Sequence, residues 1–190
     1  MIHYDDEDCE DIPNTAEEIT RRALVLSAVI TSAYDASTKQ ILDWLAQEGL
    51  QDELTPQEKE FLCGRSSEED HTNFTWKVEA LQILLWCINK VESLPPFSDQ
   101  CDTELLKKAT VFPPNPTTGF ISSATLRNEV EYLNENEDVY QAHWAVRDAQ
   151  IHRKKMPDGI DPGVIYERHF ALNRVGGYMG QSWDDITTDT

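Results

Sequence analysis

The sequence lacks the long apolar runs and the leader pattern of membrane and secreted proteins. Its longest apolar stretches, Ala23–Ile30 and Ala80–Ile88, are each interrupted by a polar residue, whereas a membrane-spanning helix needs about 20 apolar residues in a row. The N-terminal stretch is acidic from Asp5 and has neither a basic n-region nor an apolar h-region. We therefore expect a cytoplasmic protein that neither spans a membrane nor is secreted.

Basic residues are scarce. The chain has 16 Lys and Arg against 35 Asp and Glu, which gives a formal net charge of −19. Nucleic acids and anionic membrane surfaces are bound through basic patches, so we expect neither as a partner. Eight acids fall within residues 1–18, which contain no Lys or Arg, and three more fall within residues 184–190. Complementary charge instead favours a basic protein as the partner.

The four cysteines, at positions 9, 63, 87 and 101, lack the close spacing of zinc ligands and redox-active pairs. We expect all four to be reduced thiols, with Cys87 buried inside an apolar segment. The sequence also has no phosphate-binding glycine loop, no nucleophile elbow and no H-E-x-x-H pattern. No motif therefore predicts a metal, a cofactor or a catalytic residue.

Alternating strand patterns and fixed-period repeats are absent as well, and helical patterns occupy most of the chain. With 190 residues, of which 39% are hydrophobic, the chain is long enough for one domain with its own core. Residues 1–13 are predicted to form an acidic, flexible tail, because like charges repel and little apolar surface is available there. Residues 14–190 are predicted to form a helical domain.

Start and stop signals place the helices. Capping boxes at Thr15–Glu18 and Thr55–Glu58 predict two helix starts, and a further helix is expected from Ser37 to Gly49, where glycine allows a left-handed end. The segment 73–91 is predicted to be the central helix because it is apolar on almost every face. Further helices are predicted at 102–109, 123–133, 137–154 and 163–174.

These patterns predict an all-α fold. We expect a compact bundle of seven or eight helices around the central helix, followed by an ordered C-terminal tail. Leu84 and Trp86 are predicted to lie in the core, on the most buried helix.

The last two predicted helices carry polar groups where apolar ones are expected. His143 and Arg147 interrupt one helix, and Arg168 and His169 interrupt the next. Buried charges require partners, so these residues and their neighbours form one candidate cluster with a binding or structural role. Its members are His143, Arg147, Asp148, Glu167, Arg168, His169, Asn173, Trp183, Asp184 and Asp185.

The tail is predicted to complete this cluster. Trp183 supplies an apolar anchor, so we expect order at least through Asp185. Arg147 and Arg168 are each expected to pair with a tail carboxylate, Asp184 or Asp185, in the bidentate geometry of Arg with carboxylates. Three interpretations stay open: a structural network, a pocket for a small ligand or a partner's side chain, and a catalytic or metal site.

Six segments of the chain resemble a known family. They are Glu17–Leu24, Leu54–Glu58, Glu79–Trp86, His143–Ala149, Tyr166–Asn173 and Trp183–Thr190. In this order they are similar to a mostly bacterial helical domain family that is catalogued only as a domain of unknown function. The resemblance implies a helical, cytoplasmic bacterial domain, and it carries over no catalytic residue because none is established for the family.

Two classes of function follow. The first is a non-enzymatic binding protein that docks a basic partner, for example an immunity- or antitoxin-like protein that covers a cationic toxin. The alternative is a metal-assisted hydrolase or a small-ligand-binding domain that uses the C-terminal cluster of His, Arg, Glu and Asp.

Overall fold

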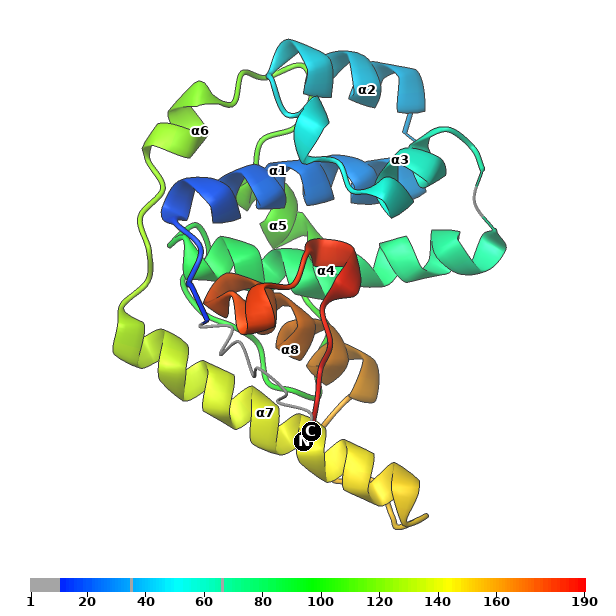
Figure 1. Cartoon of the computed structure of the whole chain (residues 1–190), viewed down its shortest axis with the longest axis vertical. Helices are drawn as coiled ribbons and strands as arrows, with labels where there is room; N and C mark the ends of the chain where they lie inside the picture. Colours follow the sequence, from blue (N-terminus) through cyan, green and yellow to red (C-terminus); the bar gives the residue numbers. More distant parts are fainter. Residues whose placement is uncertain (1–10, 35, 66) are drawn as a thin grey trace, which may run out of the picture.

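The computed structural model describes residues 11–190 except Asp35 and Ser66, and within them the protein is a stack of helices (Figure 1). Helix α4 (Glu68–Cys87) lies between α1 (Ala16–Ala33) and α8 (Pro162–Gly176), and α7 (Glu129–Ile151) packs on α8. The shorter elements are α2 (Thr38–Gln47), η1 (Gln51–Glu53), α3 (Pro56–Leu62), α5 (Thr103–Ala109), α6 (Thr118–Ser122), η2 (Tyr178–Gly180) and η3 (Trp183–Asp185).

The prediction of an all-α fold with seven or eight helices is confirmed. The described residues form eight α-helices, three short 3-10 helices and no strand. In this part of the chain, no helix is both long and apolar enough to cross a membrane. Most of the predicted acidic tail, residues 1–10, lies outside the described residues.

Helix α4 is central, as predicted, but it begins and ends earlier than the expected range 73–91. Ser67 and Asp70 form a capping box at its start. The sequence did not predict this start, because the third helical position of a capping box is usually Glu or Gln and here it is Asp. The helix ends at Cys87, and Asn89 then takes a left-handed conformation with φ of 57°. Leu84 and Trp86 are buried in the core, which confirms their predicted positions.

Helix α1 separates two apolar clusters. Its predicted capping box is present, with the Glu18 carboxylate accepting from the Thr15 amide at 2.8 Å. One face, which includes Leu26, packs against α4 in a cluster to which α8 also contributes, and the other, which includes Val25, packs against α2 and α3. As a result, 12 of its 18 residues are buried, and α1 shares the central position with α4.

The predicted helices at 123–133 and 137–154 are wrong as separate elements, because one helix, α7, spans Glu129–Ile151. Its start is set by Asn128, whose side-chain oxygen accepts from the Val130 amide at 2.9 Å. The polar residues between the two predicted helices, Asn134–Asn136, lower helix propensity without breaking the helix. Residues 123–128 connect α6 to α7 in a non-helical conformation.

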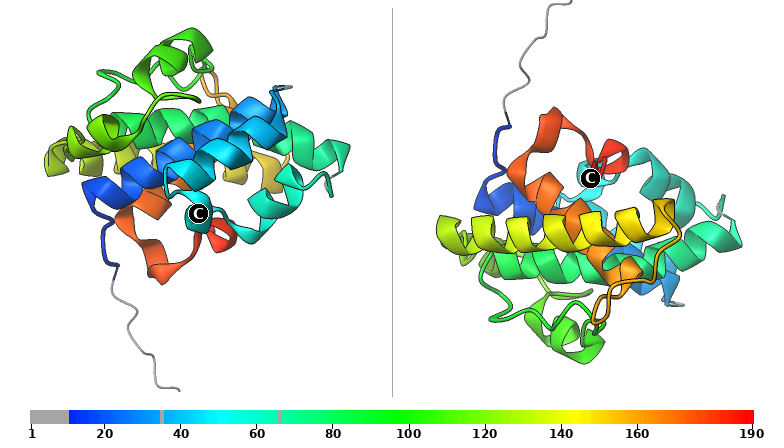
Figure 2. Two further views of the ribbon diagram at one scale, coloured as in Figure 1. Left: turned by 90° about the horizontal axis from the view of Figure 1, so that it is seen from above. Right: turned by 90° about the horizontal axis from the view of Figure 1, so that it is seen from below.

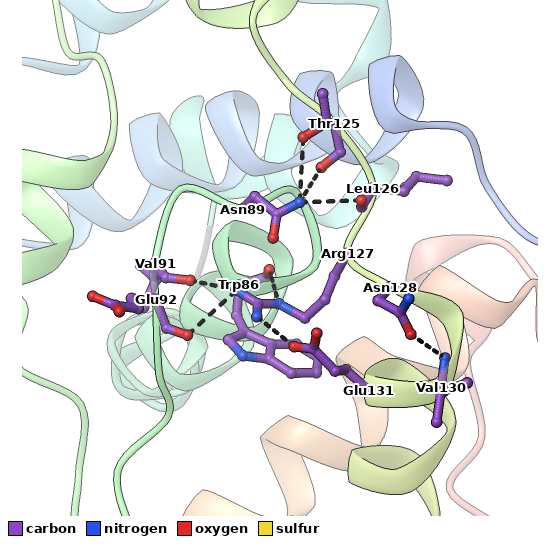
Figure 3. Close-up of polar contacts among 10 residues, drawn as sticks. All are labelled: Trp86, Asn89, Val91, Glu92, Thr125, Leu126, Arg127, Asn128, Val130 and Glu131. Atoms are coloured by element: carbon purple, nitrogen blue, oxygen red, sulfur yellow. Dashed lines mark hydrogen bonds and ion pairs between the residues drawn. The ribbon is translucent and has the colours of Figure 1, made fainter.

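Arg127 fixes this connection to the end of α4 (Figure 3). Its guanidinium donates to the carbonyls of Trp86 and Val91, each at 2.8 Å, and lies 4.4 Å from the centre of the Trp86 ring. It also pairs with Glu131 in the first turn of α7 at 2.9 Å. One side chain therefore ties the end of α4 and the loop that follows it to the first turn of α7.

The two ends of the described chain meet at the C-terminus of α8. The Asn14 amide donates to the Val175 carbonyl at 2.9 Å, and the Met179 amide donates to the Asp11 carboxylate at 2.8 Å. Gly177 ends α8 with φ of 71°, and a Cβ there would lie 2.0 Å from the Ile12 carbonyl oxygen. Residues 11–13, predicted as part of the flexible tail, thus contact the end of α8 through a close approach that requires glycine.

Candidate functional site

The α7–α8 interface holds a buried pair of histidines. His143 of α7 and His169 of α8 are each 3% exposed, and their Nδ1 atoms lie 2.8 Å apart. A hydrogen bond at this distance needs one nitrogen to donate and the other to accept, so the two neutral rings hold complementary tautomers. The sequence placed both residues in the candidate cluster, and the structure brings them into direct contact.

Burial keeps these rings neutral. It lowers the pKa of His169 to about 4, an effect that neighbouring His143 strengthens and the Asp189 carboxylate opposes. Burial also lowers the pKa of His143, and the charge of Arg147 acts in the same direction. Because uncharged imidazole can donate through one nitrogen and accept through the other, the pair presents a hydrogen-bonding group without adding positive charge.

His169 forms part of the wall of a polar pocket of about 620 Å³ between α7, α8 and the two chain ends. The pocket is lined by Asp11, Asn136, Glu137, Tyr140, His169, Asn173, Tyr178, Asp189 and Thr190. Three of these residues are acids and none is Lys or Arg. We call this cavity the acidic pocket.

The three carboxylates of the acidic pocket meet only uncharged donors among the described residues. Asp11 accepts from the Met179 amide, Glu137 from the Gln141 side chain at 2.8 Å, and Asp189 from the Thr187 hydroxyl at 2.9 Å. Several acids elsewhere pair with bases, such as Glu53 with Arg21 and Asp148 with Lys154, each at 2.7 Å. The pocket is therefore a concave region of negative potential.

Two tyrosines and two amides complete the wall. The pKa of the Tyr178 hydroxyl is raised by burial and then by the negative charges of Asp189 and Asp11, which is how a local negative field acts on an acid. Tyr140 meets the His169 ring edge-on, with 5.9 Å between centroids. The Asn136 side-chain oxygen is enclosed, and no described residue donates to it. The wall thus offers several acceptors and aromatic surface to a cationic group.

Glu167 and Arg168, two other predicted cluster residues, turn to the interior of the helix stack. Glu167 pairs with Lys77 of α4 at 2.9 Å, and burial raises the pKa of the Glu167 carboxyl. Arg168 is fully buried, donates to the Pro95 carbonyl at 2.9 Å, and lies over the Phe97 ring. Both residues belong to the packing of α8 against α4 and the loop that follows it.

The predicted pairing of Arg147 and Arg168 with Asp184 or Asp185 is wrong. Arg147 points outward from α7, where its guanidinium donates to Gln150 at 3.2 Å. Arg168 and Phe170 are two positions apart and so lie on different faces of α8, and the tail packs on the Phe170 face.

The two tail acids have other partners. The Asp184 carboxylate accepts from the Gln57 amide at the start of α3 at 3.2 Å, and the Asp185 carboxylate accepts from the Ser182 hydroxyl at 2.6 Å. Neither acid lies in an ion pair among the described residues.

The tail is ordered through Asp185, as predicted, and Trp183 anchors it. Trp183 is 6% exposed and meets the Phe170 ring edge-on, with 4.9 Å between centroids. The Arg22 guanidinium of α1 lies 4.7 Å from the centre of the Trp183 ring. Asn173 then donates to the Thr187 carbonyl at 2.8 Å, so the tail returns along α8 toward the acidic pocket.

The candidate metal ligands do not converge. The described residues contain no group of three or more His, Cys, Asp or Glu side chains arranged to hold a metal ion. His143 and His169 face each other, Glu167 faces Lys77, and Asp184 faces the start of α3.

A family model for "Domain of unknown function (DUF4272)" matches residues 3–186, which is nearly the whole chain. The protein belongs to the DUF4272 family. No curated protein and no solved structure gave a match. The match agrees with the resemblance drawn from the six sequence segments, and membership carries no activity with it.

In this DUF4272 chain, the predicted cluster left out seven residues that line the acidic pocket: Asp11, Asn136, Glu137, Tyr140, Tyr178, Asp189 and Thr190. Glu137 and Asn136 look like ordinary solvent-facing residues of a helix, and Asp11 is one of many acids near the N-terminus. No local pattern identifies them, because the pocket forms only when residue 11 and residue 189 come to the same end of α8. Of the predicted cluster, His169 and Asn173 line the pocket and His143 lies directly behind it.

Proposed function

We propose that this protein is a binding protein that docks a basic partner and receives one of its cationic side chains in the acidic pocket. The observation that carries the proposal is a pocket with three carboxylates and no Lys or Arg. Like charges gathered in a concave site repel each other and focus negative potential. An Arg or Lys head group entering the pocket would neutralise that repulsion and find carboxylate, carbonyl and hydroxyl acceptors.

The net charge of the chain supports the same class of partner. At −19, the protein attracts a basic protein over a distance and increases its association rate, while the pocket supplies local specificity. An immunity- or antitoxin-like role, in which the protein covers a cationic toxin, is the specific form of this proposal. A cytoplasmic location belongs to it as well, and the free thiols of Cys63, Cys87 and Cys101 support a reducing compartment.

A small cationic ligand is the second candidate for the same pocket. The volume of about 620 Å³ falls within the range of about 300–1,000 Å³ typical of small-molecule sites. The Tyr140 and Tyr178 side chains in the wall give such a ligand aromatic surface. Both candidates present the pocket with the same chemical group, a cation with several hydrogen-bond donors. Comparing a peptide probe with a small-molecule probe therefore distinguishes them.

Binding of a short oligoarginine peptide, measured by titration calorimetry, tests the proposal. We expect Asp189→Asn and Asp11→Asn each to weaken binding by about tenfold, because each removes a charge that would bond directly to a guanidinium. Asp52→Asn is the matched control, since Asp52 is exposed on η1 and does not line the pocket. Binding should also weaken strongly near 1 M salt, where the Debye length is about 3 Å.

The outcomes separate the candidates. Tight binding of the peptide and weak binding of free arginine amide would support a protein partner, and equal binding would support a small ligand. No measurable binding of either probe, or equal losses in Asp189→Asn and Asp52→Asn, would exclude the acidic pocket as the site.

A further inference from the structure

Helix α7 has a second apolar stripe that is largely exposed, with Tyr140 at its border against the His169 ring of α8. The inward face of α7, with Val139, Val146 and Ala149, packs against the core. The outward stripe alternates steps of three and four residues, the spacing of a coiled-coil seam. It consists of Val130, Leu133, Glu137, Tyr140, Trp144, Arg147 and Ile151.

The apolar members of this stripe are exposed. Leu133 is 53% exposed, Trp144 50% and Ile151 65%. Exposed apolar side chains that gather in one patch are typical of interaction sites. Viewed from below, α7 crosses the near face of the molecule with its length open to the viewer (right panel of Figure 2). The seam runs over 21 residue steps, or about 32 Å at 1.5 Å per residue, and carries Trp and Tyr, which are enriched in protein interfaces.

The two charged members of the stripe indicate the occupant. Glu137 and Arg147 stand five positions on either side of residue 142 and have opposite charge. In the described part of the chain neither forms an ion pair, and each contacts only a glutamine on its own helix, Gln141 or Gln150. Each is therefore free to bond to a charge presented from outside.

A second copy of α7, antiparallel and centred on residue 142, matches six of the seven positions of the stripe, and only Val130 falls opposite a residue beyond the end of α7. Glu137 then lies opposite Arg147 of the partner subunit, and by symmetry Arg147 lies opposite Glu137 of the partner subunit. Tyr140 meets Trp144 of the partner subunit, and Leu133 meets Ile151 of the partner subunit. In a two-fold symmetric interface each contact occurs twice, once with each subunit supplying the first residue of the pair.

A parallel arrangement fails the same test. With two copies of α7 in parallel and in register, Glu137 would face Glu137 of the partner subunit and Arg147 would face Arg147 of the partner subunit. Like charges facing each other at an interface are strongly unfavourable. The charges thus select the antiparallel orientation, and the spacing selects the register.

We infer that α7 is the interface of a symmetric, antiparallel homodimer, held by the stripe and oriented by two Glu137–Arg147 ion pairs. The stripe shares Glu137 and Tyr140 with the acidic pocket, whereas Asp11 and Asp189 of the pocket lie off the seam, and Trp144 and Arg147 of the seam lie outside the pocket. The two proposals are therefore distinguished by the residues that each holds alone: the pocket is tested with Asp11 and Asp189, and the dimer with Trp144 and Arg147 together with the Glu137–Arg147 charge exchange.

Sedimentation equilibrium on the full chain tests the inference. We expect a dimer, and we expect Trp144→Glu to dissociate it. Glu137→Arg and Arg147→Glu should each weaken the dimer at least about tenfold, because each places like charges opposite one another. The double variant with both changes should restore the wild-type dissociation constant, since it exchanges the charges and keeps the pairing.

Asp138→Arg is the matched control, an exposed acid on the same helix but outside the seam, and it should leave the dimer unchanged. Circular dichroism and thermal unfolding of each variant verify that it is folded. A wild-type chain that stays monomeric up to about 1 mM, the range of very weak association, would overturn the inference. So would single charge reversals without effect, or a double variant that fails to regain dimerisation.

Discussion

Leu84 shows how strongly a single residue can be placed by its surroundings. It is fully buried on α4, in the cluster shared by α1, α4 and α8. Leu84→Ala should lower the free energy of unfolding by roughly 2–5 kcal/mol, because it removes buried apolar surface and leaves a cavity. Denaturant titration measures this loss, with Leu105→Ala, an exposed leucine on α5, as the control that should change stability by less than about 0.5 kcal/mol. A loss below about 1 kcal/mol at Leu84 would contradict its place in the core.

At the same scale, sequence reasoning works for residues whose environment is set by neighbours in the chain. Thr15 and Thr55 cap their helices as predicted, because a capping box lies within four residues. Arg147 and Arg168 carry the same charge and were assigned the same partners, yet one is exposed and the other is fully buried. Nothing within one turn of either arginine distinguishes the two, because their surroundings come from distant parts of the chain.

At the scale of elements, the helices themselves were largely predictable and their faces were not. α7 carries two apolar stripes, and periodicity alone does not say which one faces the core. Val139, Val146 and Ala149 face inward, while Trp144 and Ile151 face outward. The choice depends on how α8 packs against α7, a long-range contact that no window of sequence contains.

The α7–α8 contact should respond to pH through its histidine pair. Burial lowers the pKa of His169 from its ordinary 6.5 to about 4. As the pH falls below about 6.5, the unfolded chain takes up a proton that the folded chain refuses until about pH 4. The contribution of His169 to the free energy of unfolding is therefore fully present above about pH 6.5 and decreases as the pH falls from there to about 4. His169→Gln should flatten the fall in unfolding free energy between the two limits.

Comparison between variants isolates the histidine. Burial raises the pKa of the Glu79 and Glu135 carboxyls, so their effect on stability has the opposite sign and is shared by every variant. His152→Gln is the control, because His152 is an exposed residue at the end of α7. Equal pH dependence in wild type and His169→Gln, measured by denaturant titration across the window, would refute a neutral buried pair.

At the scale of the whole molecule, the candidate site is a product of chain closure. Asp11 and Asp189 are 178 positions apart in the sequence, and both line the acidic pocket. The sequence shows that both ends are acidic, and this pattern alone reads as two solvated tails. Only the packing of the ends against α8 turns the two charges into one concave site, which is why the fold class could be predicted and the pocket could not.

Trp183 holds this closure in place. Its ring contacts Phe170 of α8 edge-on and carries the Arg22 guanidinium of α1 over its face, and Arg22 is itself paired with the buried Glu58 of α3. A single tail residue thus contacts a network that spans three helices. Trp183→Ala should lower the free energy of unfolding by about 3–5 kcal/mol, because it removes a large buried aromatic surface.

The tail offers its own control for this last prediction. Asp185 lies two residues further on, is exposed, and among the described residues its side chain bonds only to Ser182 within the tail, so Asp185→Ala should change stability by less than about 0.5 kcal/mol. Because Asp189 follows Trp183 into the acidic pocket, Trp183→Ala should also weaken oligoarginine binding, whereas Asp185→Ala should leave the affinity nearly unchanged. Denaturant titration and calorimetry on the same samples measure both effects. Loss of stability without loss of binding would show that the tail reaches the pocket independently of its anchor.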